Sequence, residues 1–229
     1  MIAALRIGIV DTGVNPWHSH VRGDVTGCRI HLGSDGTIEE DGDFRDPVGH
    51  GTAVAGVLRE AFPEAEIYAV RVFGAADATY PSLVARGILR AAAQQCDFVN
   101  VSVSVPPGPG EDVLAAACAA VIDAGCVLVA SARPERPGWL PASLRGVYAV
   151  TADDTLAFGD VRAGGPLQLV ASGRPRDLGF VAREANLWGH SFACARGLVY
   201  LVRQARAAAL ASQSRPTTEN RVDYIGKKE

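Results

Sequence analysis

Short apolar runs recur along the chain, separated by polar segments or by longer stretches with helical spacing. Runs of this length and composition are typical of buried strands. They predict strands at residues 5–10, 66–73, 98–105, 126–130 and 146–151, with a weaker signal at residues 167–171.

Apolar positions with helical spacing predict helices at residues 50–62, 82–95, 111–123 and 191–211. Pro63 ends the first helix, Pro81 begins the second and Gly125 closes the third. Residues 17–48 are polar, glycine-rich and acidic, which predicts a surface loop with a short strand near residues 28–32. Strands that alternate with helices indicate an α/β protein with a mostly parallel, doubly wound sheet.

The composition fits a single folded domain. Of the 229 residues, 48% are apolar and only 21% are charged, which excludes a disordered chain. This length suits one α/β domain with a sizeable core. No repeat or internal boundary interrupts the pattern, so we expect one domain over residues 1–212. Residues 213–229 are polar and are expected to form a frayed C-terminal tail.

Charge and hydropathy narrow the range of partners. The net charge is −3, and no dense run of Lys or Arg occurs apart from Lys227-Lys228, so we expect neither nucleic acid nor acidic lipid. No run approaches 18 apolar residues, so we expect no membrane span. The N-terminus, MIAALRIGIVDTG, lacks the basic segment, long apolar segment and cleavage site of a secretory signal, which predicts a cytoplasmic protein.

We interpret neither the cysteines nor the acidic residues as metal ligands. Cys28, Cys96, Cys118, Cys126 and Cys194 are odd in number and lack paired spacing, which favours reduced thiols in the core. Neither zinc-finger nor C-x-x-C spacing occurs among them. We interpret the acidic residues of the first loop as a solvated surface; calcium binding is the alternative, although EF-hand spacing is absent. These residues are Glu39, Glu40, Asp41, Asp43 and Asp46. No metal or cofactor is expected.

Three glycine-flanked segments place an acid, an imidazole and a hydroxyl at the ends of apolar runs. Asp11 follows the run IGIV, His50 lies in GHGTAVAGVL, and Ser191 lies in GHSFACARG. Such boundaries are where an open α/β sheet keeps its chemistry. A serine hydroxyl needs an adjacent base to act as a nucleophile; His50 can take its proton, and Asp11 can orient the imidazole. Singly, each residue can be a turn, loop or capping residue, so the prediction of a triad depends on the joint pattern.

The order Asp, His, Ser is that of subtilisin, and the chain resembles the subtilisin-like serine peptidases, or subtilases. Gly49-His50-Gly51-Thr52, followed by Ala53-Val54-Ala55-Gly56, is close to the family's histidine block, HGTxVAG. The resemblance extends from about residue 5 to about residue 205. It implies a three-layer subtilisin-like fold and a serine endopeptidase with Asp11, His50 and Ser191 as catalytic residues.

A segment between the blocks resembles the strand that lines the substrate cleft of subtilases. It reads Asn100-Val101-Ser102-Val103-Ser104. Ser102, Val103 and Ser104 are therefore expected to form a β-edge on which a peptide substrate lies as an added strand.

Arg133 departs from the family pattern. Subtilases follow a core strand with Gly-Asn, and the Asn amide donates to the oxyanion; here the corresponding strand leads to Ala132-Arg133. Loss of that donor in subtilisin costs roughly 10²–10³ in turnover. Arg is also a donor, so Arg133 either serves the oxyanion from a longer reach or pairs with Glu135 and points away. The N–H of Ser191, at the start of a helix, is a further oxyanion donor in both cases.

Two residues beside Ser191 also need an interpretation. The family usually has Thr where His190 stands, and we interpret His190 as a polar residue of the helix start; a second base is the alternative. Cys194 follows Ser191 by one turn and is expected in the core.

These patterns predict a cytoplasmic serine endopeptidase of narrow specificity that cuts a specific peptide, such as a leader peptide, through an acyl-enzyme. The first triad residue comes at position 11, so we expect no pro-segment: the chain folds unaided or depends on a separately encoded partner protein. Subtilases that transfer the acyl group to an amine in peptide natural-product pathways are an analogy only.

The alternative is a degenerate subtilase that binds a peptide or a partner without turning it over. The replacement at Arg133 and the altered surroundings of Ser191 favour this alternative, whereas the complete Asp-His-Ser set favours the enzyme.

Overall fold

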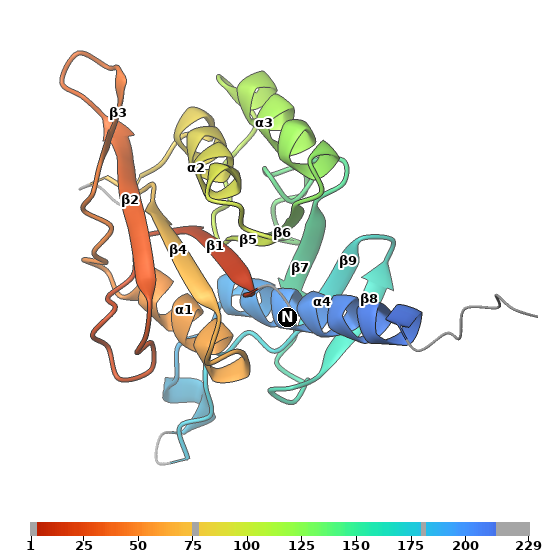
Figure 1. The fold of residues 1–229 in the computed structure, drawn as a ribbon. Helices are drawn as coiled ribbons and strands as arrows, with labels where there is room; N and C mark the ends of the chain where they lie inside the picture. The colour runs from red at the N-terminus through yellow and green to blue at the C-terminus, as the bar shows by residue number, and fades with distance from the viewer. Residues whose placement is uncertain (1–3, 75–77, 180–181, 214–229) are drawn as a thin grey trace, which may run out of the picture.

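One nine-stranded sheet organises the molecule, which we describe from a computed structural model covering residues 4–74, 78–179 and 182–213. The strands are β1 (Arg6–Asp11), β2 (Val25–Leu32), β3 (Ile38–Asp41), β4 (Glu66–Arg71), β5 (Phe98–Val101), β6 (Val127–Ser131), β7 (Tyr148–Ala152), β8 (Val161–Gly165) and β9 (Gln168–Ala171). Their spatial order is β3-β2-β4-β1-β5-β6-β7-β9-β8 (Figure 1).

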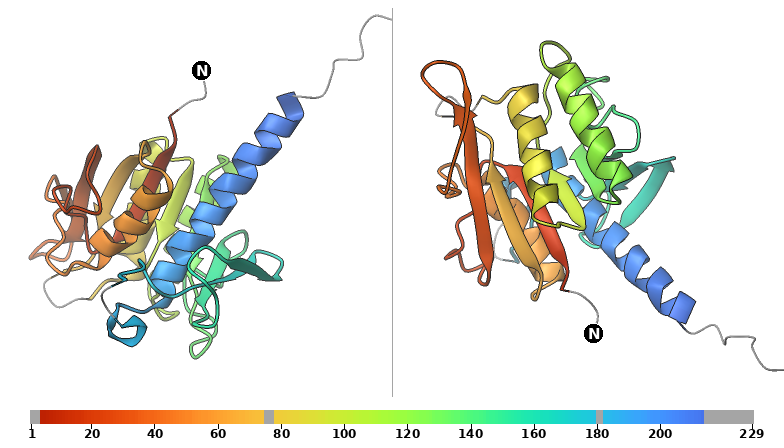
Figure 2. Two further views of the ribbon diagram at one scale, coloured as in Figure 1. Left: turned by 90° about the horizontal axis from the view of Figure 1, so that it is seen from below. Right: turned by 45° about the horizontal axis from the view of Figure 1, so that its top comes forward.

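Four α-helices cover the two faces of this sheet. They are α1 (His50–Ala61), α2 (Pro81–Ala93), α3 (Glu111–Asp123) and α4 (His190–Gln213), with a 3-10 turn at Arg183–Ala185. Figure 2 shows α1 and α4 on one face and α2 and α3 on the other. Each pair of helices closes its own apolar cluster against the sheet, so the architecture has the three layers of a doubly wound α/β fold.

The centre of the sheet is parallel and its edges are antiparallel. The central strand, β1, pairs in parallel with β4 and β5, and its residues Ile7, Ile9 and Val10 are almost completely buried, as expected for a strand covered on both faces. Among the strands of the described sheet, β3 and β8 at the two edges are the ones that pair antiparallel. The strand order changes direction at β1, and the carboxyl ends of strands beside such a switch point are where α/β proteins bind ligands.

The α/β fold predicted from the sequence is confirmed, with three corrections. Residues 17–48 hold two strands, β2 and β3, rather than a loop with one short strand. The edge strand β8 was not predicted. The predicted strand at residues 98–105 ends at Val101, after which the chain leaves the sheet and returns only for an isolated bridge between Val105 and Leu140.

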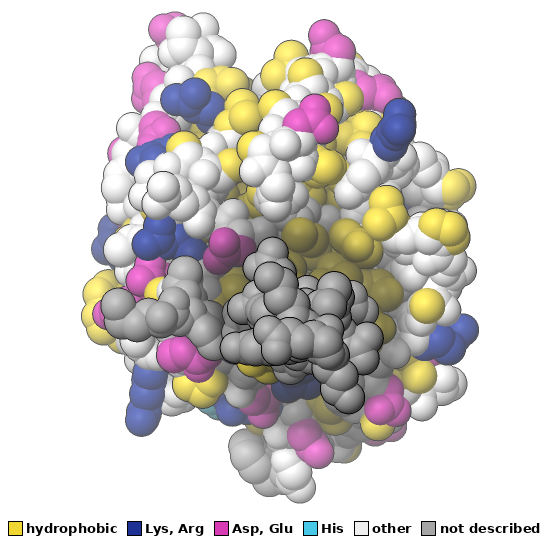
Figure 3. Space-filling view, turned by 45° about the vertical axis from the view of Figure 1, so that its right-hand side comes forward, with side chains coloured by type: hydrophobic (Ala, Val, Ile, Leu, Met, Phe, Trp, Pro, Cys, Tyr) yellow, Lys and Arg dark blue, Asp and Glu magenta, His cyan; other side chains and the backbone are white. Residues whose placement is uncertain are grey.

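Further features of the molecule are the distribution of charge on its surface, the state of its cysteines and the extent of its helices. On the face drawn in Figure 3, acidic and basic side chains are interspersed. All five cysteines are buried and free, as predicted. Among the described residues, no helix is both long and apolar enough to cross a membrane. The tail expected from residue 213 onward lies, beyond Gln213 itself, outside the described residues.

Candidate active site

The acid and the imidazole of the predicted triad meet at the carboxyl edge of the sheet. Asp11 is the last residue of β1, and His50 is the first residue of α1. The His50 Nδ1 lies 2.7 Å from the Asp11 Oδ1. Asp11 is fully buried, whereas the His50 side chain is 33% exposed. The acid is therefore shielded from water, while the imidazole reaches the surface.

Close backbone packing makes this contact possible. The Asp11 Oδ1 also accepts a hydrogen bond from the N–H of Thr12 at 2.6 Å. A Cβ on Gly51 would come within 2.1 Å of the Gly13 carbonyl oxygen and 3.1 Å of the Asp11 Oδ1. The glycine after His50 is therefore required, because any side chain there would push α1 away from the end of β1.

The electrostatics favour a charged His50. Burial lowers the pKa of His50, but the charge and hydrogen bond of Asp11, together with the charge of Asp46, outweigh burial and raise the pKa above its ordinary value. A carboxylate on Nδ1 also fixes the neutral tautomer that leaves Nε2 free to act as a base.

A second carboxylate, Asp46, holds the start of α1. Its Oδ1 accepts from the Thr12 hydroxyl and from the backbone N–H groups of Val48 and Gly49, at 2.8 to 3.0 Å. Its Oδ2 accepts from the N–H and the hydroxyl of Thr52, at 2.8 and 2.7 Å. Burial raises the pKa of Asp46, but these hydrogen bonds outweigh it and keep the pKa below its usual value.

Asp46 therefore corrects the interpretation of the acidic loop as a solvated surface. It is buried because it satisfies backbone donors that a helix N-terminus leaves without partners. The other four acids do face solvent at least partly. Glu40 forms ion pairs with Arg86 and Arg90, Asp41 with Arg29, and Asp43 with Arg45 and Arg71, while the Glu39 carboxylate lies 3.5 Å from the His31 Nε2. Within residues 4–74, 78–179 and 182–213, no group of three or more His, Cys, Asp or Glu side chains is placed to hold a metal ion.

The serine stands in the first turn of α4, beside the end of β5. The Ser191 Oγ donates to the Ser102 carbonyl oxygen at 3.4 Å, and the Ser102 hydroxyl donates to the Ser191 carbonyl oxygen at 3.3 Å. Asn100 donates its amide to the Ser102 hydroxyl at 2.7 Å. The ring of Phe192, next to Ser191, lies 5.4 Å from the His50 ring. The fold therefore brings the hydroxyl, the imidazole and the acid to one edge, with Ser191 hydrogen-bonded to Ser102.

Ser102, Val103 and Ser104 follow β5 at the same edge. Ser102 and Val103 are buried, and the buried Ser104 hydroxyl has no hydrogen-bond partner among the residues that the structure describes. The three residues pair with no strand of the described sheet. The expectation that they form a β-edge for a peptide stays a prediction.

Arg133 lies two residues after the end of β6, and its side chain is exposed. The pairing with Glu135 that we considered is not formed among the described residues, because the Glu135 carboxylate lies against His190 instead, 3.7 Å from its Nε2. Arg133 is close enough to His190 for its charge to lower the pKa of that imidazole. Arg133 thus stands on the Ser191 side of the site, with a side chain that is not fixed by an ion pair.

His190 and Cys194 occupy well-defined positions around Ser191. His190 begins α4, and its Nδ1 accepts a hydrogen bond from the N–H of Ala152 at 2.9 Å, which fits its interpretation as a residue of the helix start. Cys194 is fully buried, and burial raises the pKa of its thiol. It belongs to the core, as predicted.

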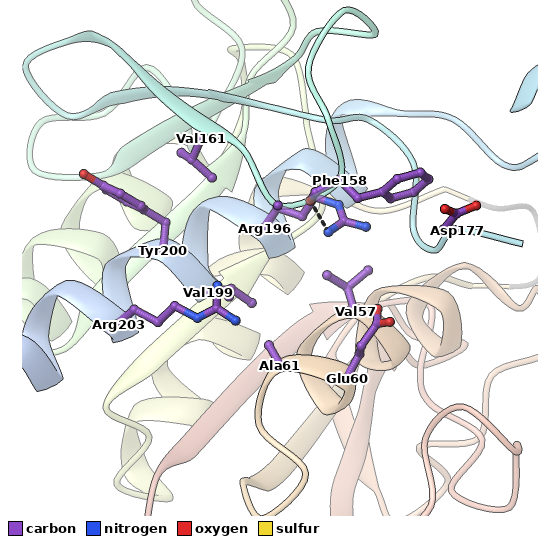
Figure 4. A pocket seen from close by; sticks show the side chains of 11 residues that line it. Val57, Glu60, Ala61, Phe158, Val161, Asp177, Arg196, Val199, Tyr200 and Arg203 are labelled. Carbon is purple, nitrogen blue, oxygen red and sulfur yellow. Dashed lines mark hydrogen bonds between the residues drawn. The ribbon is translucent and has the colours of Figure 1, made fainter. Parts of the chain in front are cut away.

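Two cavities among the described residues lie along α1, and the larger of them adjoins the predicted triad. A cavity of about 280 Å³ lies between the later turns of α1 and α4, where Val57 and Glu60 face Arg196 and Val199 (Figure 4). No triad residue lines it. A cavity of about 420 Å³ is lined by residues that flank the triad, including Gly49, Thr52 and Leu187.

Sequence reasoning missed the residues that support the triad. Thr12 connects Asp46 to the first turn of α1, since its hydroxyl donates to Asp46 and accepts the N–H of Gly51 at 3.0 Å. The sequence feature that indicates this role for Asp46 is its position three residues before Gly49. From there an acidic side chain can accept hydrogen bonds from the first N–H groups of the helix that follows. The support that Asn100 gives to Ser102 had no local signal, because the hydrogen bond depends on how the chain bends after β5.

Comparison with known proteins gives the following relatives. A sequence model of the subtilase family matches residues 3–219. Subtilisin-like protease SBT6.1 of Arabidopsis thaliana is 34% identical over 111 residues, which are 45% of this chain and 10% of that protein. Subtilisin amylosacchariticus of Bacillus subtilis subsp. amylosacchariticus is 25% identical over 236 residues, 94% of this chain and 57% of that protein. The chain thus spans little more than half of the subtilisin's length and a small part of the plant protease.

Solved structures show the same fold at low identity. A mutant of the epidermin leader peptide processing serine protease of Staphylococcus aureus has a TM-score of 0.66 at 19% identity, covering 95% of this chain and 71% of that one. A lanthipeptide protease has a TM-score of 0.63 at 15% identity, with coverage of 93% and 77%. A mutant of the PatA protease domain has a TM-score of 0.62 at 23% identity, with coverage of 89% and 81%.

Proposed function

The chain belongs to the subtilase family, and from this premise we propose that it is a serine endopeptidase acting through Asp11, His50 and Ser191. The observation that carries the proposal is the 2.7 Å contact between the His50 Nδ1 and the buried Asp11 carboxylate, at the edge where α4 presents Ser191. This pair supplies an oriented base beside a hydroxyl, which is what nucleophilic catalysis by serine requires.

The proposed reaction proceeds through an acyl-enzyme. The Ser191 Oγ attacks the carbonyl carbon of the scissile peptide bond while His50 Nε2 takes the hydroxyl proton. The tetrahedral intermediate collapses, the C–N bond breaks, and His50 returns the proton to the leaving amine. Water then attacks the ester with His50 again as the base, and Ser191 is released. Asp11 stabilises the imidazolium in both steps without accepting the proton.

Stabilisation of the oxyanion is proposed to come from two donors. The N–H of Ser191 lies in the first turn of α4, where backbone donors and the helix dipole favour a developing negative charge. The exposed guanidinium of Arg133, two residues beyond β6, is the second donor and acts from a longer reach than the asparagine amide of other subtilases.

The substrate is proposed to be an extended peptide held across the carboxyl edge of the sheet. Ser102, Val103 and Ser104 offer backbone groups outside the sheet for its pairing on one side of Ser191. The cavity of about 420 Å³ beside Gly49 and Thr52 accepts the segment on the other side. The similarity to a lanthipeptide protease and a leader peptide processing protease supports narrow specificity for a precursor or leader peptide.

We also infer that the protein works in the cytoplasm. Among the described residues all five cysteines are free and buried, and free buried thiols are usual in reducing compartments. Dependence of the chain on a separately encoded partner protein, considered from the sequence, also belongs to the proposed function.

A second candidate is a pseudo-subtilase that binds peptide without cleaving it. The observation that favours it is the hydrogen bond of the Ser191 hydroxyl to the Ser102 carbonyl, together with Arg133 at the position of the oxyanion asparagine. In free enzymes, however, catalytic hydrogen bonds are often long and form only with substrate bound.

Labelling with a fluorophosphonate distinguishes the two candidates. The probe forms a bond between the Ser191 Oγ and phosphorus and releases fluoride, and it reacts only with an activated serine. We expect one adduct by intact mass on the wild type and none on Ser191→Ala. A folded wild type without an adduct would overturn the peptidase proposal and leave the binding protein.

A further inference from the structure

We propose that His190 is a positioning residue that keeps Ser191 in its reactive place only while the His190 imidazole is neutral. This inference rests on the proposed serine chemistry and adds a second histidine to it. His190 would act on the hydroxyl through the backbone of the first turn of α4, without touching the substrate.

The first observation is the anchor itself. The His190 Nδ1 accepts the N–H of Ala152 at 2.9 Å, and Ala152 is the last residue of β7. Ala152 is paired with Ala171 of β9, whereas the pairing of this strand with β6 ends at Val150, so the attachment point is held by one neighbouring strand. The next residue along the helix is Ser191. The imidazole therefore connects the sheet to the helix turn that carries the nucleophile.

The second observation is the tautomer that this contact requires. A nitrogen that accepts an N–H has no proton of its own, so the neutral ring carries its proton on Nε2. Nε2 faces the Glu135 carboxylate at 3.7 Å, which favours a proton at that atom. Protonation of Nδ1 would place two N–H donors opposite each other at 2.9 Å, and the anchor to Ala152 would be lost.

The surroundings keep the ring neutral over most of the physiological range. The side chain is only 14% exposed, and Trp188 packs edge-on against it, with ring centroids 5.4 Å apart. Two charged groups face the ring, Glu135 and Arg133. Burial and the charge of Arg133 lower the pKa of His190 more than Glu135 raises it.

The effect of losing the anchor would be local. Phe192 and Cys194, which follow in α4, are almost fully buried, so the body of the helix stays in place. His190 and Ser191, the first two residues of the helix, are only partly buried, and Ser191 contributes both the hydroxyl and the N–H proposed for the oxyanion. A shift there of a fraction of an ångström weakens both contributions together.

The test compares pH profiles of fluorophosphonate labelling for the wild type, His190→Asn and His190→Leu. Asn places an oxygen close to the position of Nδ1, so it can accept the Ala152 N–H without titrating. Leu fills the space but leaves that N–H without an acceptor. Circular dichroism at each pH verifies that the three proteins are folded.

For full labelling of the wild type, two imidazoles must be neutral: His50, which acts as the base, and His190, which holds the Ala152 N–H. We expect the labelling rate to fall about tenfold per pH unit below the pKa of His50, and to lose a further factor of about ten in all, with a steeper slope, as the pH passes through the lower pKa of His190. His190→Asn keeps the tenfold slope throughout and matches the wild type above pH 7. His190→Leu labels about tenfold more slowly at every pH, because a buried donor has lost its partner.

Equal slopes for the wild type and His190→Asn would overturn the positioning role, as would wild-type rates in His190→Leu. If His190→Asn does not fold, the imidazole ¹⁵N shifts of wild-type His190 decide instead: a proton on Nδ1 at neutral pH overturns the proposal, and a proton on Nε2 supports it. No labelling of the wild type at any pH would overturn the serine chemistry itself, which is a different result from equal slopes.

Discussion

The two helices that carry His50 and Ser191 of the proposed triad begin in different ways. The start of α1, with His50, is held by a buried carboxylate, Asp46, which accepts five hydrogen bonds from Thr12, Val48, Gly49 and Thr52. The start of α4, with Ser191, is held by the imidazole of its own first residue, His190, and by two longer hydrogen bonds between Ser191 and Ser102. Both helices cover the same face of the sheet and contribute to the same apolar cluster, so the difference lies in the polar attachment alone.

The difference makes the two attachments respond differently to acid. The pKa of Asp46 is lowered, so its stabilisation is complete above the ordinary range of a carboxyl and is lost only as the pH falls through the folded-state value. The pKa of His190 is lowered from 6.5, so its stabilisation is complete above 6.5 and declines as the pH falls below that value. Mild acid should therefore loosen the serine side of the site before the histidine side.

The largest expected effect on the labelling rate comes from replacing Asp11, the carboxylate that contacts His50. Asp11→Asn should lower the labelling rate of Ser191 by about 10⁴, because an amide does not hold the Nδ1–H tautomer of His50. The thermal unfolding of the variant serves as the control for folding. A rate within tenfold of the wild type would mean that the 2.7 Å contact does not serve catalysis.

The next largest effect is expected from removing the Asp46 carboxylate, which holds the start of α1. Asp46→Ala should lower the free energy of unfolding by about 3 kcal/mol, because several buried donors lose their acceptor. The matched control is Asp43→Ala, a neighbouring acid that pairs with Arg45 near the surface and should cost less than about 1 kcal/mol. Denaturant melts measure both, and equal losses would contradict the role given to Asp46.

Two glycines of α1 provide a steric test of the same side. Gly51→Ala should lower the free energy of unfolding by about 1–3 kcal/mol, because its Cβ would meet the Gly13 carbonyl oxygen at 2.1 Å. Gly56→Ala, in the same helix, meets nothing closer than 3.5 Å and should raise the free energy of unfolding by about 0.5–1 kcal/mol through helix propensity. Changes of the same sign in the two variants would argue against close packing at Gly51.

The smallest effects should come from the two charges that face His190. Glu135→Gln removes the charge that raises the pKa of His190 and should move the lower break of the labelling profile to lower pH. Arg133→Asn removes the charge that lowers it and should move the break to higher pH. Each shift should stay below about one pH unit, because both groups are exposed and screened by solvent. Shifts in the same direction would contradict the assignment of that break to His190.

Arg133→Asn also reports on the oxyanion, and the two effects are separable. A change in oxyanion stabilisation alters the labelling rate also on the alkaline side of both histidine pKa values, where both imidazoles are neutral, whereas a change in the pKa of His190 alters only the acid side. Faster labelling on the alkaline side would show that Arg133 is a weaker donor than asparagine.

Most of the fold was predictable from the sequence because the central strands are buried on both faces. Runs such as IGIV before Asp11 are too short for a helix and are typical of a buried strand. The strands missed were β3 and β8, whose residues are mostly exposed and carry no apolar periodicity. The strand predicted to continue to residue 105 ended at Val101, because an apolar pattern does not show where a chain leaves its neighbours in a sheet.

By itself the sequence determined the fold class and the three glycine-flanked blocks, and it predicted the triad, since these depend on local patterns and residue types. Only the tertiary structure decided that Asp46 is buried beneath α1, that Ser102 receives the Ser191 hydroxyl, and that Glu135 faces His190 rather than Arg133. The physical reason is that hydrogen bonds and ion pairs form between groups distant in the chain, and their partners are chosen by the packing of the sheet and helices that bring them together.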